Sequence, residues 1–155
     1  MKRVAGLQYD VLDDLLGFAL RRAQLVMSGA FGEATRGADI TPPRLTALII
    51  VGANPGISQT TLGEVLGIAR SGAMLLTDWA QERGFVERRD HPDDARAWGL
   101  HLTRSGEQFV QRTKRRVLEH DMKRSGCLAP AERRELMRLL EKLAASSSIH
   151  PEEVA

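Results

Sequence analysis

The sequence is poor in several residue types and patterns that mark common classes of protein. Its 155 residues include a single cysteine, Cys127, which excludes an internal disulfide framework and fits a reducing cytoplasm. No apolar run approaches the roughly 20 residues that span a bilayer. The start, MKRVAGLQYD, lacks the apolar centre and the cleavage site of a signal peptide. We therefore expect a cytoplasmic protein of one domain, or of one compact module with an extension, and no membrane association.

The sequence also lacks the motifs of catalysis and metal binding. The four histidines, His91, His101, His120 and His150, fall in an expected loop, strand, helix and tail, without metal-ligand spacing. There is no P-loop, nucleophile elbow or His-Glu zinc motif. We therefore expect no enzymatic activity, no metal and no cofactor.

The charge balance is nearly even. The chain has 22 Lys and Arg against 20 Asp and Glu, a formal net charge of +2, and an apolar fraction of 43%. These values are typical of an ordinary globular protein. The sum of the charges says little about an acidic partner, so their positions along the chain carry more information.

The spacing of apolar residues predicts a mainly helical chain. Apolar residues at steps of three and four predict a long amphipathic helix from Asp10 to Phe31. Thr41 and Pro42 suit the cap and first turn of a second helix. Its run from Leu45 to Val51 is apolar on nearly every side, which predicts that this helix is buried.

Two short helices follow, joined by a tight turn. Ser58 is a plausible cap for the first, QTTLGEVLG, and Gly67 tolerates the positive φ that a short turn between helices requires. The second is expected from about Ala69 to Arg83. Two such helices with a glycine-containing turn are typical of a helix-turn-helix, whose second helix enters the major groove of DNA.

A β-hairpin is expected directly after these helices. FVERR and WGLHLT have strand character, and we expect the polar segment DHPDDARA between them to form a loop in which Pro92 ends the strands. A helix-turn-helix followed by a hairpin predicts a winged helix. Arg88, Arg89 and Arg96 would then lie where a wing reaches phosphates or the minor groove.

The last part of the chain is again helical. Thr103 can cap a helix from about Arg104 to Lys123, and a last helix is expected over Pro130–Ala145 with a stripe of leucines. The apolar stripes at the two ends of the chain could pack on a partner subunit or on each other within a monomer.

This order of elements, with ITPPRLTALIIVGANPGISQTTLGEVLGI, ERGFVERR and DHPDDARAWGLHLTRSGE, resembles the MarR family of bacterial transcription regulators over about Leu12 to Ala144. The resemblance implies a mainly α fold with a small β-hairpin wing, and a homodimer. The implied regions are an N-terminal dimerisation helix (1–35), a winged helix-turn-helix (36–103), C-terminal dimerisation helices (104–146) and a flexible tail (147–155). The dimer would read half-sites roughly 10 bp apart on a pseudo-palindromic operator.

The resemblance also implies where DNA is contacted. Arg70 could bind guanine in a bidentate way and Met74 could touch thymine methyl groups. Met74 and Leu75 could instead pack against the wing or neighbouring helices. Gly72 would let the backbone approach the bases. Many relatives have an aspartate at the cap position that Ala69 occupies here. The candidate DNA contacts are Ser58, Gln59, Thr60, Arg70, Ser71, Gly72, Met74, Arg88, Arg89 and Arg96.

Arg96 is the strongest candidate on the wing. The family's arginine at the matching place enters the minor groove, whose negative potential is high where it is narrow. Asp93 and Asp94 are expected to order the loop or to orient Arg96. The alternative is that Arg96 is a solvated loop arginine. Ala95 stands where the family usually has a second arginine.

An effector is implied as well, because ligands in this family bind between the dimerisation helices and the winged helix. Arg21, Arg22 and Arg44 near that cleft suit a small anionic aromatic or acyl ligand, although Arg21 and Arg22 could instead pair with the partner subunit. The stretch LGFALRRAQL resembles the branch that responds to hydroxycinnamoyl-CoA thioesters. We therefore expect a repressor of aromatic catabolism that its ligand releases from DNA.

Two other functions stay open. Cys127 could serve a thiol-based redox sensor, although a small packing residue is the simpler interpretation of a lone thiol. The winged helix could also be a protein-interaction module that has lost operator binding.

Overall fold

The computed structural model describes residues 4–91 and 94–146, and side chains only outside residues 90–97; the tail 147–155, expected to be flexible, lies outside the described residues. The expected fold class, mainly helical with a two-stranded antiparallel hairpin, is confirmed. The elements in chain order are the 3₁₀ turn η1 (Asp10–Asp13), α1 (Leu16–Ala34), α2 (Pro42–Ala53), α3 (Gln59–Leu66), α4 (Arg70–Glu82), β1 (Val86–His91), β2 (Asp94–Leu102), α5 (Arg104–Arg124) and α6 (Pro130–Ala145).

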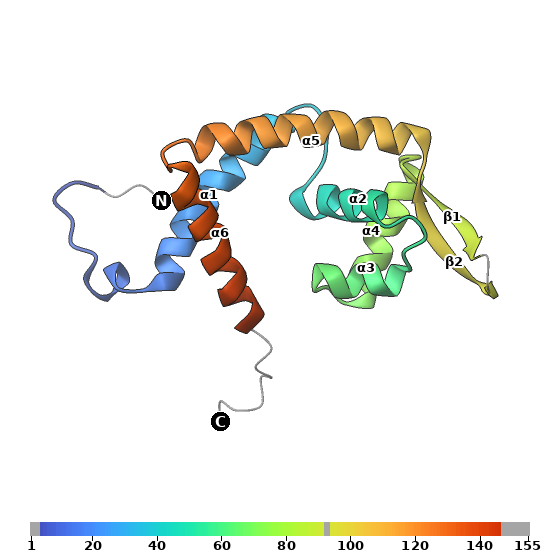
Figure 1. Ribbon diagram of the computed structural model, residues 1–155, viewed down its shortest axis with the longest axis horizontal. Coiled ribbons are helices and arrows are strands. Elements are labelled where there is room, and N and C mark those ends of the chain that lie inside the picture. Colours follow the sequence, from blue (N-terminus) through green and yellow to red (C-terminus); the bar gives the residue numbers. More distant parts are fainter. Residues whose placement is uncertain (1–3, 92–93, 147–155) are drawn as a thin grey trace, which may run out of the picture.

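The helix α5 connects two parts of the molecule. Figure 1 shows α1 and α6 at one end of α5, and α2, α3, α4 and the hairpin at its other end. Within the described residues, no helix combines the length and the apolar character needed to cross a bilayer. The same residues contain no group of three or more His, Cys, Asp or Glu side chains that could hold a metal ion.

Local signals explain the helix-turn-helix. The Ser58 hydroxyl accepts a hydrogen bond of 3.0 Å from the backbone N–H of Thr61, which caps α3. Gly67 ends α3 with a φ of 62°, a left-handed conformation that glycine adopts without strain. The chain therefore turns sharply into α4, as the sequence predicts.

A single apolar core holds the winged helix together. It gathers side chains from α2, α3, α4, both strands and α5, and Leu48, Leu62, Leu100 and Val51 are its largest fully buried members. The buried face of α2 carries Leu45, Ala47, Leu48 and Val51, whereas Ile49 and Ile50 stay partly exposed. The prediction that the whole run from Leu45 to Val51 is buried is thus confirmed for one face only, because the other face borders an open cleft.

The start of α2 differs from its expected capping. Thr41 occupies the N-cap position, but its side chain makes no capping hydrogen bond. Pro42 and Pro43 follow it, and neither has a backbone N–H to donate to the Thr41 hydroxyl.

The hairpin is longer than the sequence suggested. An eight-residue loop was expected between the strands, but β1 continues to His91 and β2 begins at Asp94, with an irregular register between Asp90 and His91. The prediction of a long loop is wrong because polar composition reports exposure of side chains, whereas a hairpin needs only paired backbone groups. Pro92 and Asp93 lie outside the described residues.

The loop before α3 adds a short third pairing beside β2. The Gly56 N–H donates to the Leu100 carbonyl and the Leu100 N–H donates to the Ile57 carbonyl, each at 2.9 Å. A Cβ at Gly99 would lie 2.5 Å from the Gly56 carbonyl oxygen, so the two backbones approach too closely for a side chain there. The start of α3 is therefore fixed against the hairpin.

A close backbone contact joins α5 to the turn after α4. A Cβ at Gly106 would lie only 2.0 Å from the Phe85 carbonyl oxygen. Thr103 caps α5 by accepting from the Gly106 N–H at 3.0 Å, and its hydroxyl donates to the Gly84 carbonyl at 2.6 Å. The rings of Phe85 and Phe109 stack with centroids 4.5 Å apart. These contacts make α5 and the winged helix one packed unit.

The first helix begins later than predicted. A continuous helix from Asp10 was expected, but Asp10 has a φ of 49° and Leu15 is extended. The segment Asp10–Asp13 forms a 3₁₀ turn, and α1 starts at Leu16 and continues to Ala34. Aspartate side chains compete with the helix for backbone groups, which explains why apolar spacing alone misplaced this start.

The helix α1 packs along α5, and a polar cluster fixes the far end of the pair. The Arg124 guanidinium donates to Glu33 at 2.8 Å, and His120 Nδ1 lies 3.7 Å from the same carboxylate. The hydrogen bond and charge of Arg124 hold the pKa of Glu33 below its usual range. The carboxylate thus stays ionised, and the pair persists, well below neutral pH.

The helix α6 has the bounds that the sequence predicted, but it buries none of its residues. It is joined to α5 by an ion pair of 2.8 Å between Arg133 and Asp121. Its leucine stripe therefore remains largely uncovered by the described residues. Together with neighbouring helices, it exposes Leu16, Leu25, Val26, Leu118, Met122, Leu136, Met137, Leu139, Leu140 and Leu143.

Replacing Gly106 by alanine tests the contact between α5 and the winged helix. We expect Gly106→Ala to lower the free energy of unfolding by about 2 kcal/mol or more, because the backbone of Phe85 must move to admit the methyl group. Gly72→Ala is the matched control, since its Cβ would lie 3.6 Å from the Ile68 side chain and should raise stability by about 1 kcal/mol. Urea unfolding measures both. Equal stability of the two variants would contradict the close contact.

Candidate functional site

The outward face of α4 carries mainly apolar and acidic side chains, whereas a surface that binds DNA is usually basic. Ala73, Thr77 and Ala80 are buried on one side of the helix. The opposite side carries exposed Ser71, Met74, Leu75 and Glu82, together with half-buried Asp78.

The two apolar side chains of this face stay substantially exposed among the described residues. Met74 is 48% exposed and Leu75 is 68% exposed. Neighbouring helices therefore cover them only in part, and packing against the wing stays a prediction, because the side chains of wing residues 90–97 lie outside the described residues.

The start of α4 leaves its first backbone N–H groups without a side-chain cap. Ala69 occupies the N-cap position and makes no capping hydrogen bond. Arg70 and Ser71 are exposed there, and Gly72 is partly exposed. These three residues lie together at the helix start, as predicted, where N–H groups and a guanidinium face an approaching anion.

The start of α3 offers a second group of polar residues. Gln59 is half-buried and Thr60 is exposed. The Ser58 hydroxyl is used within the chain, since it caps Thr61 and lies 2.9 Å from the Thr61 hydroxyl. The Ser58 hydroxyl therefore serves mainly to cap α3. The exposed Thr60 is the better placed of the predicted DNA contacts at this helix start.

Arg88 lies on the face of the hairpin that is turned toward α4. Its Nη2 is 3.4 Å from Asp78 Oδ1, and its guanidinium carbon lies 4.1 Å from the centre of the Trp98 ring. An arginine that stacks on an aromatic ring and pairs with a carboxylate is held in one orientation. Arg88 thus fixes the hairpin to α4 and offsets the negative charge of Asp78.

Arg89 lies on the opposite face of the hairpin. Side chains alternate along a strand, so Arg89 shares a face with Glu87 and with His101, the pairing partner of Glu87. Arg89 Nε donates to Glu87 Oε1 at 2.8 Å. Two neighbouring arginines that the sequence presents as equivalent wing residues are therefore turned toward different parts of the molecule.

The third wing arginine is not described to the same extent. Arg96 belongs to β2, but its side chain lies outside the described residues, as do Asp93 and the side chain of Asp94. Their expected roles stay predictions.

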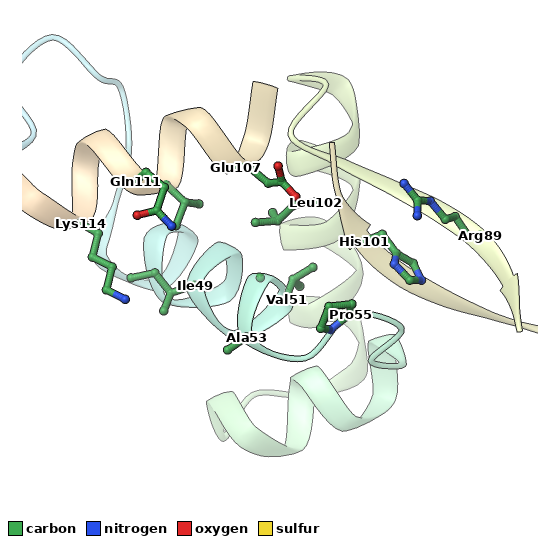
Figure 2. Close-up of a pocket in the computed structure, with 12 residues that line it drawn as sticks. Ile49, Val51, Ala53, Pro55, Arg89, His101, Leu102, Glu107, Gln111 and Lys114 are labelled. Carbon is green, nitrogen blue, oxygen red and sulfur yellow. The ribbon is translucent and has the colours of Figure 1, made fainter. Parts of the chain in front are cut away.

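A cleft of about 590 Å³ lies between α2, α5 and the hairpin. Figure 2 shows Glu107, Gln111 and Lys114 reaching it from α5, and Arg89 and His101 from the strands. Ile49, Val51, Ala53, Pro55, Leu102 and Val110 supply apolar walls. The cleft thus combines apolar walls with two cations, Arg89 and Lys114, and one carboxylate, Glu107, and Arg89 is also paired with Glu87. The two cations suit the anionic groups of a ligand that has an apolar body.

The arginines predicted to bind the ligand do not line this cleft. Arg21 donates to Gln24 at 3.3 Å on the exposed side of α1. Arg22 lies 6.0 Å from the centre of the Phe18 ring, and its Nε is buried without a hydrogen-bond partner among the described residues. Arg44 stacks on Trp79 at 4.6 Å and borders a separate open groove. The structure therefore does not bring these three arginines together.

Similarity to known proteins decides the family. The model of the MarR family matches residues 38–97. A protein of Thauera aromatica, described as a regulator of the hcr operon, is 33% identical over 140 residues, which are 90% of this chain and 84% of that protein. The repressor CouR bound to a 23-mer DNA duplex is 32% identical with a TM-score of 0.83, over 90% of this chain and 99% of that one. CouR bound to p-coumaroyl-CoA is 31% identical with a TM-score of 0.79, over 89% and 97%.

The chain belongs to the MarR family. It is therefore a DNA-binding transcription regulator of the winged-helix type and not an enzyme, as the sequence predicts. In this fold α4 occupies the position of the recognition helix, and the hairpin occupies that of the wing.

Sequence reasoning expected a ligand cleft beside the winged helix but missed the residues that line this cleft of the MarR-family protein. Among its lining residues, Glu107, Gln111 and Lys114 lie on one side of α5, and His101 lies on β2. The spacing of Glu107, Gln111 and Lys114, at steps of four and three residues, does predict that they share one side of a helix. Nothing in the sequence indicates that this side meets α2 and the hairpin, because that meeting depends on tertiary packing.

Cys127 also differs from its simplest interpretation. The thiol is exposed between α5 and α6, so it is not a packing residue within this chain.

The contact between Arg88 and Trp98 generates a prediction about DNA binding. We expect Trp98→Ala to weaken DNA binding about two- to fivefold, because an exposed cation–π contact is worth about 0.5–1 kcal/mol in holding the wing arginine. Trp98→Phe keeps a ring beneath the guanidinium and should bind within twofold of the natural sequence, an effect of roughly 0.4 kcal/mol. Fluorescence anisotropy with a labelled operator duplex measures both affinities. Unchanged DNA binding by Trp98→Ala would contradict the idea that Trp98 positions the wing arginine Arg88 for DNA.

Proposed function

We propose that this protein is a homodimeric repressor that binds a pseudo-palindromic operator and leaves it when a small anionic aromatic ligand binds. An aromatic acyl-CoA thioester of the hydroxycinnamoyl class is the proposed effector. Two solved structures of one relative support the two halves of this proposal, since CouR is known both with a DNA duplex and with p-coumaroyl-CoA. Such a protein acts in the cytoplasm, where the DNA lies.

The observation that carries the proposal is the position of Arg89. It belongs to the wing and also lines the cleft between α2, α5 and the hairpin. A wing arginine contributes to DNA affinity by neutralising phosphate. An anionic ligand in the cleft competes for the same guanidinium, so each ligand lowers the affinity of the other.

The chemistry of the cleft suits the proposed effector. A volume of about 590 Å³ falls within the usual range of small-molecule sites. The apolar walls suit an aromatic ring, while Arg89 and Lys114 suit a carboxylate, phosphate or pyrophosphate. The effector need change the operator affinity by only about 5–150-fold, which corresponds to 1–3 kcal/mol of coupling.

The homodimer is supported by the uncovered apolar surface of α1, α5 and α6. Three elements expose a set of large side chains that no part of the described chain covers, and α6 has no buried residue. An apolar surface of this size on a small protein usually marks an interface. Residues 1–35 and 104–146 are then the dimerisation regions, and residues 36–103 carry the winged helix. Arg21 and Arg22 are proposed to contact the effector or the partner subunit across this interface.

A charge in the leucine stripe tests the dimer. We expect Leu140→Glu to produce monomers in sedimentation-velocity runs, because its side chain, 39% exposed in the chain, would be desolvated in the interface. Lys142→Glu on the exposed end of the same helix is the matched control and should remain dimeric. DNA binding should weaken together with dimerisation, since one winged helix reads one half-site. A dimeric Leu140→Glu variant would place the interface elsewhere.

Effector release is tested by titrating the protein bound to DNA from the region flanking its own gene. We expect p-coumaroyl-CoA or feruloyl-CoA to release the DNA, whereas the free acids and CoA alone should not. Lys114→Gln should raise the thioester concentration for half-release about tenfold or more, because a hydrogen bond to a charged group is lost. Lys123→Gln, an exposed lysine of α5 outside the cleft, is the control.

The outcomes of this titration are distinct. If none of the compounds changes DNA binding, the proposed effector class is rejected, while the claim that the protein is a DNA-binding regulator is kept. Equal effects of Lys114→Gln and Lys123→Gln would reject the cleft as the effector site. Weakened response in Arg21→Gln, Arg22→Gln or Arg44→Gln alone would move the site to those arginines.

A further inference from the structure

We propose that α4 recognises its operator through the methyl groups of thymine, which Met74 and Leu75 contact in the major groove. This inference rests on the proposed operator binding and adds which chemical group on the bases is read. It starts from the composition of the recognition face. Arg70 is the only lysine or arginine in α4, and it stands at the first residue of the helix.

Beyond Arg70, the outward face has few groups that can form hydrogen bonds with base edges. Ser71 is the remaining polar group of the first turn, and the next exposed residues are Met74 and Leu75. Asp78 follows one turn later, but its carboxylate is already paired with Arg88. The middle of the face is therefore apolar, and hydrogen-bonded readout is confined to its start.

Thymine offers the matching group. The donors and acceptors of the major groove are polar for every base pair, and the C5-methyl group of thymine is the apolar exception. Met74 and Leu75 are 48% and 68% exposed, so both side chains have area left to bury against such methyl groups. They lie on one side of the helix, one position apart, and can contact neighbouring steps of the duplex.

The surroundings of the apolar pair favour DNA over an apolar protein partner. Arg70 precedes the pair at the start of α4, and Arg88 of the wing reaches the same helix about one turn after the pair, at Asp78. The uncapped N–H groups at the start of α4 add partial positive charge at the same end. A patch of two apolar side chains between cationic groups is complementary to methyl groups between phosphates.

Glycine at position 72 brings this face close to the bases. A Cβ there would meet only the Ile68 side chain, at 3.6 Å, so packing within the chain does not require glycine. Because Gly72 has no side chain, the surface of α4 between its first turn and Leu75 projects little beyond the backbone. Short contacts from Met74 and Leu75 to base methyl groups then become possible.

The test compares thymine with uracil, which pairs identically and lacks only the methyl group. A tight 24-bp duplex is first selected with the natural dimer from a random pool made with thymine. Each thymine of that duplex is then replaced singly by deoxyuridine, and Kd is measured by anisotropy at fixed salt. We expect about fourfold weaker binding at one or two positions in each half-site, because a buried methyl group is worth about 0.8 kcal/mol.

Variants assign the effect to the side chains. In Leu75→Ala or Met74→Ala, the penalty of uracil should fall below about 1.5-fold at the contacted position, since the partner of the methyl group is gone. Val65→Ala, an exposed apolar residue on α3, is the matched control and should keep the full penalty. A contacted thymine can also be replaced by cytosine or by 5-methylcytosine. The duplex with 5-methylcytosine should bind more tightly than the duplex with cytosine, because only the former carries the methyl group.

Each outcome decides something different. Failure to select any duplex would reject operator binding itself, and with it the proposed function. Selection of a duplex on which every uracil substitution is neutral would overturn thymine reading while leaving operator binding intact. A penalty that persists in both alanine variants would assign the methyl contact to residues outside α4. Normal DNA binding by a variant that carries both Met74→Ala and Leu75→Ala would overturn the proposal and indicate that the apolar pair serves a protein partner.

Discussion

The contact of Gly106 with the Phe85 backbone is the constraint on which the rest of the structure depends. It joins α5 to the turn between the recognition helix and the wing so closely that no side chain fits between them. Because α1 and α6 lie at the other end of α5, the parts proposed for dimerisation and for DNA binding are connected through one rigid helix (Figure 1). The cleft opens directly beside this junction, where a bound molecule touches α2, α5 and the hairpin together.

The two adjacent wing arginines, Arg88 and Arg89, lie on opposite faces of β1 and contact different parts of the molecule. Arg88 faces α4 and is held by Trp98 and Asp78, so it keeps the wing and the recognition helix in register. Arg89 faces the cleft and lies within reach of whatever binds there. Strand alternation alone produces this division, because neighbouring residues point to opposite faces. Charge on the wing therefore links the hairpin to α4 at one position, and at the next it lines the cleft while paired with Glu87.

The sequence predicted those parts of the molecule that local chemistry controls. Ser58, Gly67 and Thr103 fix helix ends through a hydroxyl cap or a left-handed turn, and each was assigned correctly from the sequence. The start of α1 and the length of the hairpin were wrong, since apolar spacing and polarity do not report backbone conformation. The cleft was not predictable, because its lining residues come from α2, the hairpin and α5 and meet only in the folded chain.

The low charge of the recognition helix affects how the protein is distributed over a genome. Affinity for DNA of arbitrary sequence comes mainly from counterion release, and a helix with one cation releases few ions. Few copies are then held at the millions of competing sites that contain no operator. A larger share of the protein stays free in solution, so a small number of molecules can occupy the operator and respond quickly when the effector concentration changes.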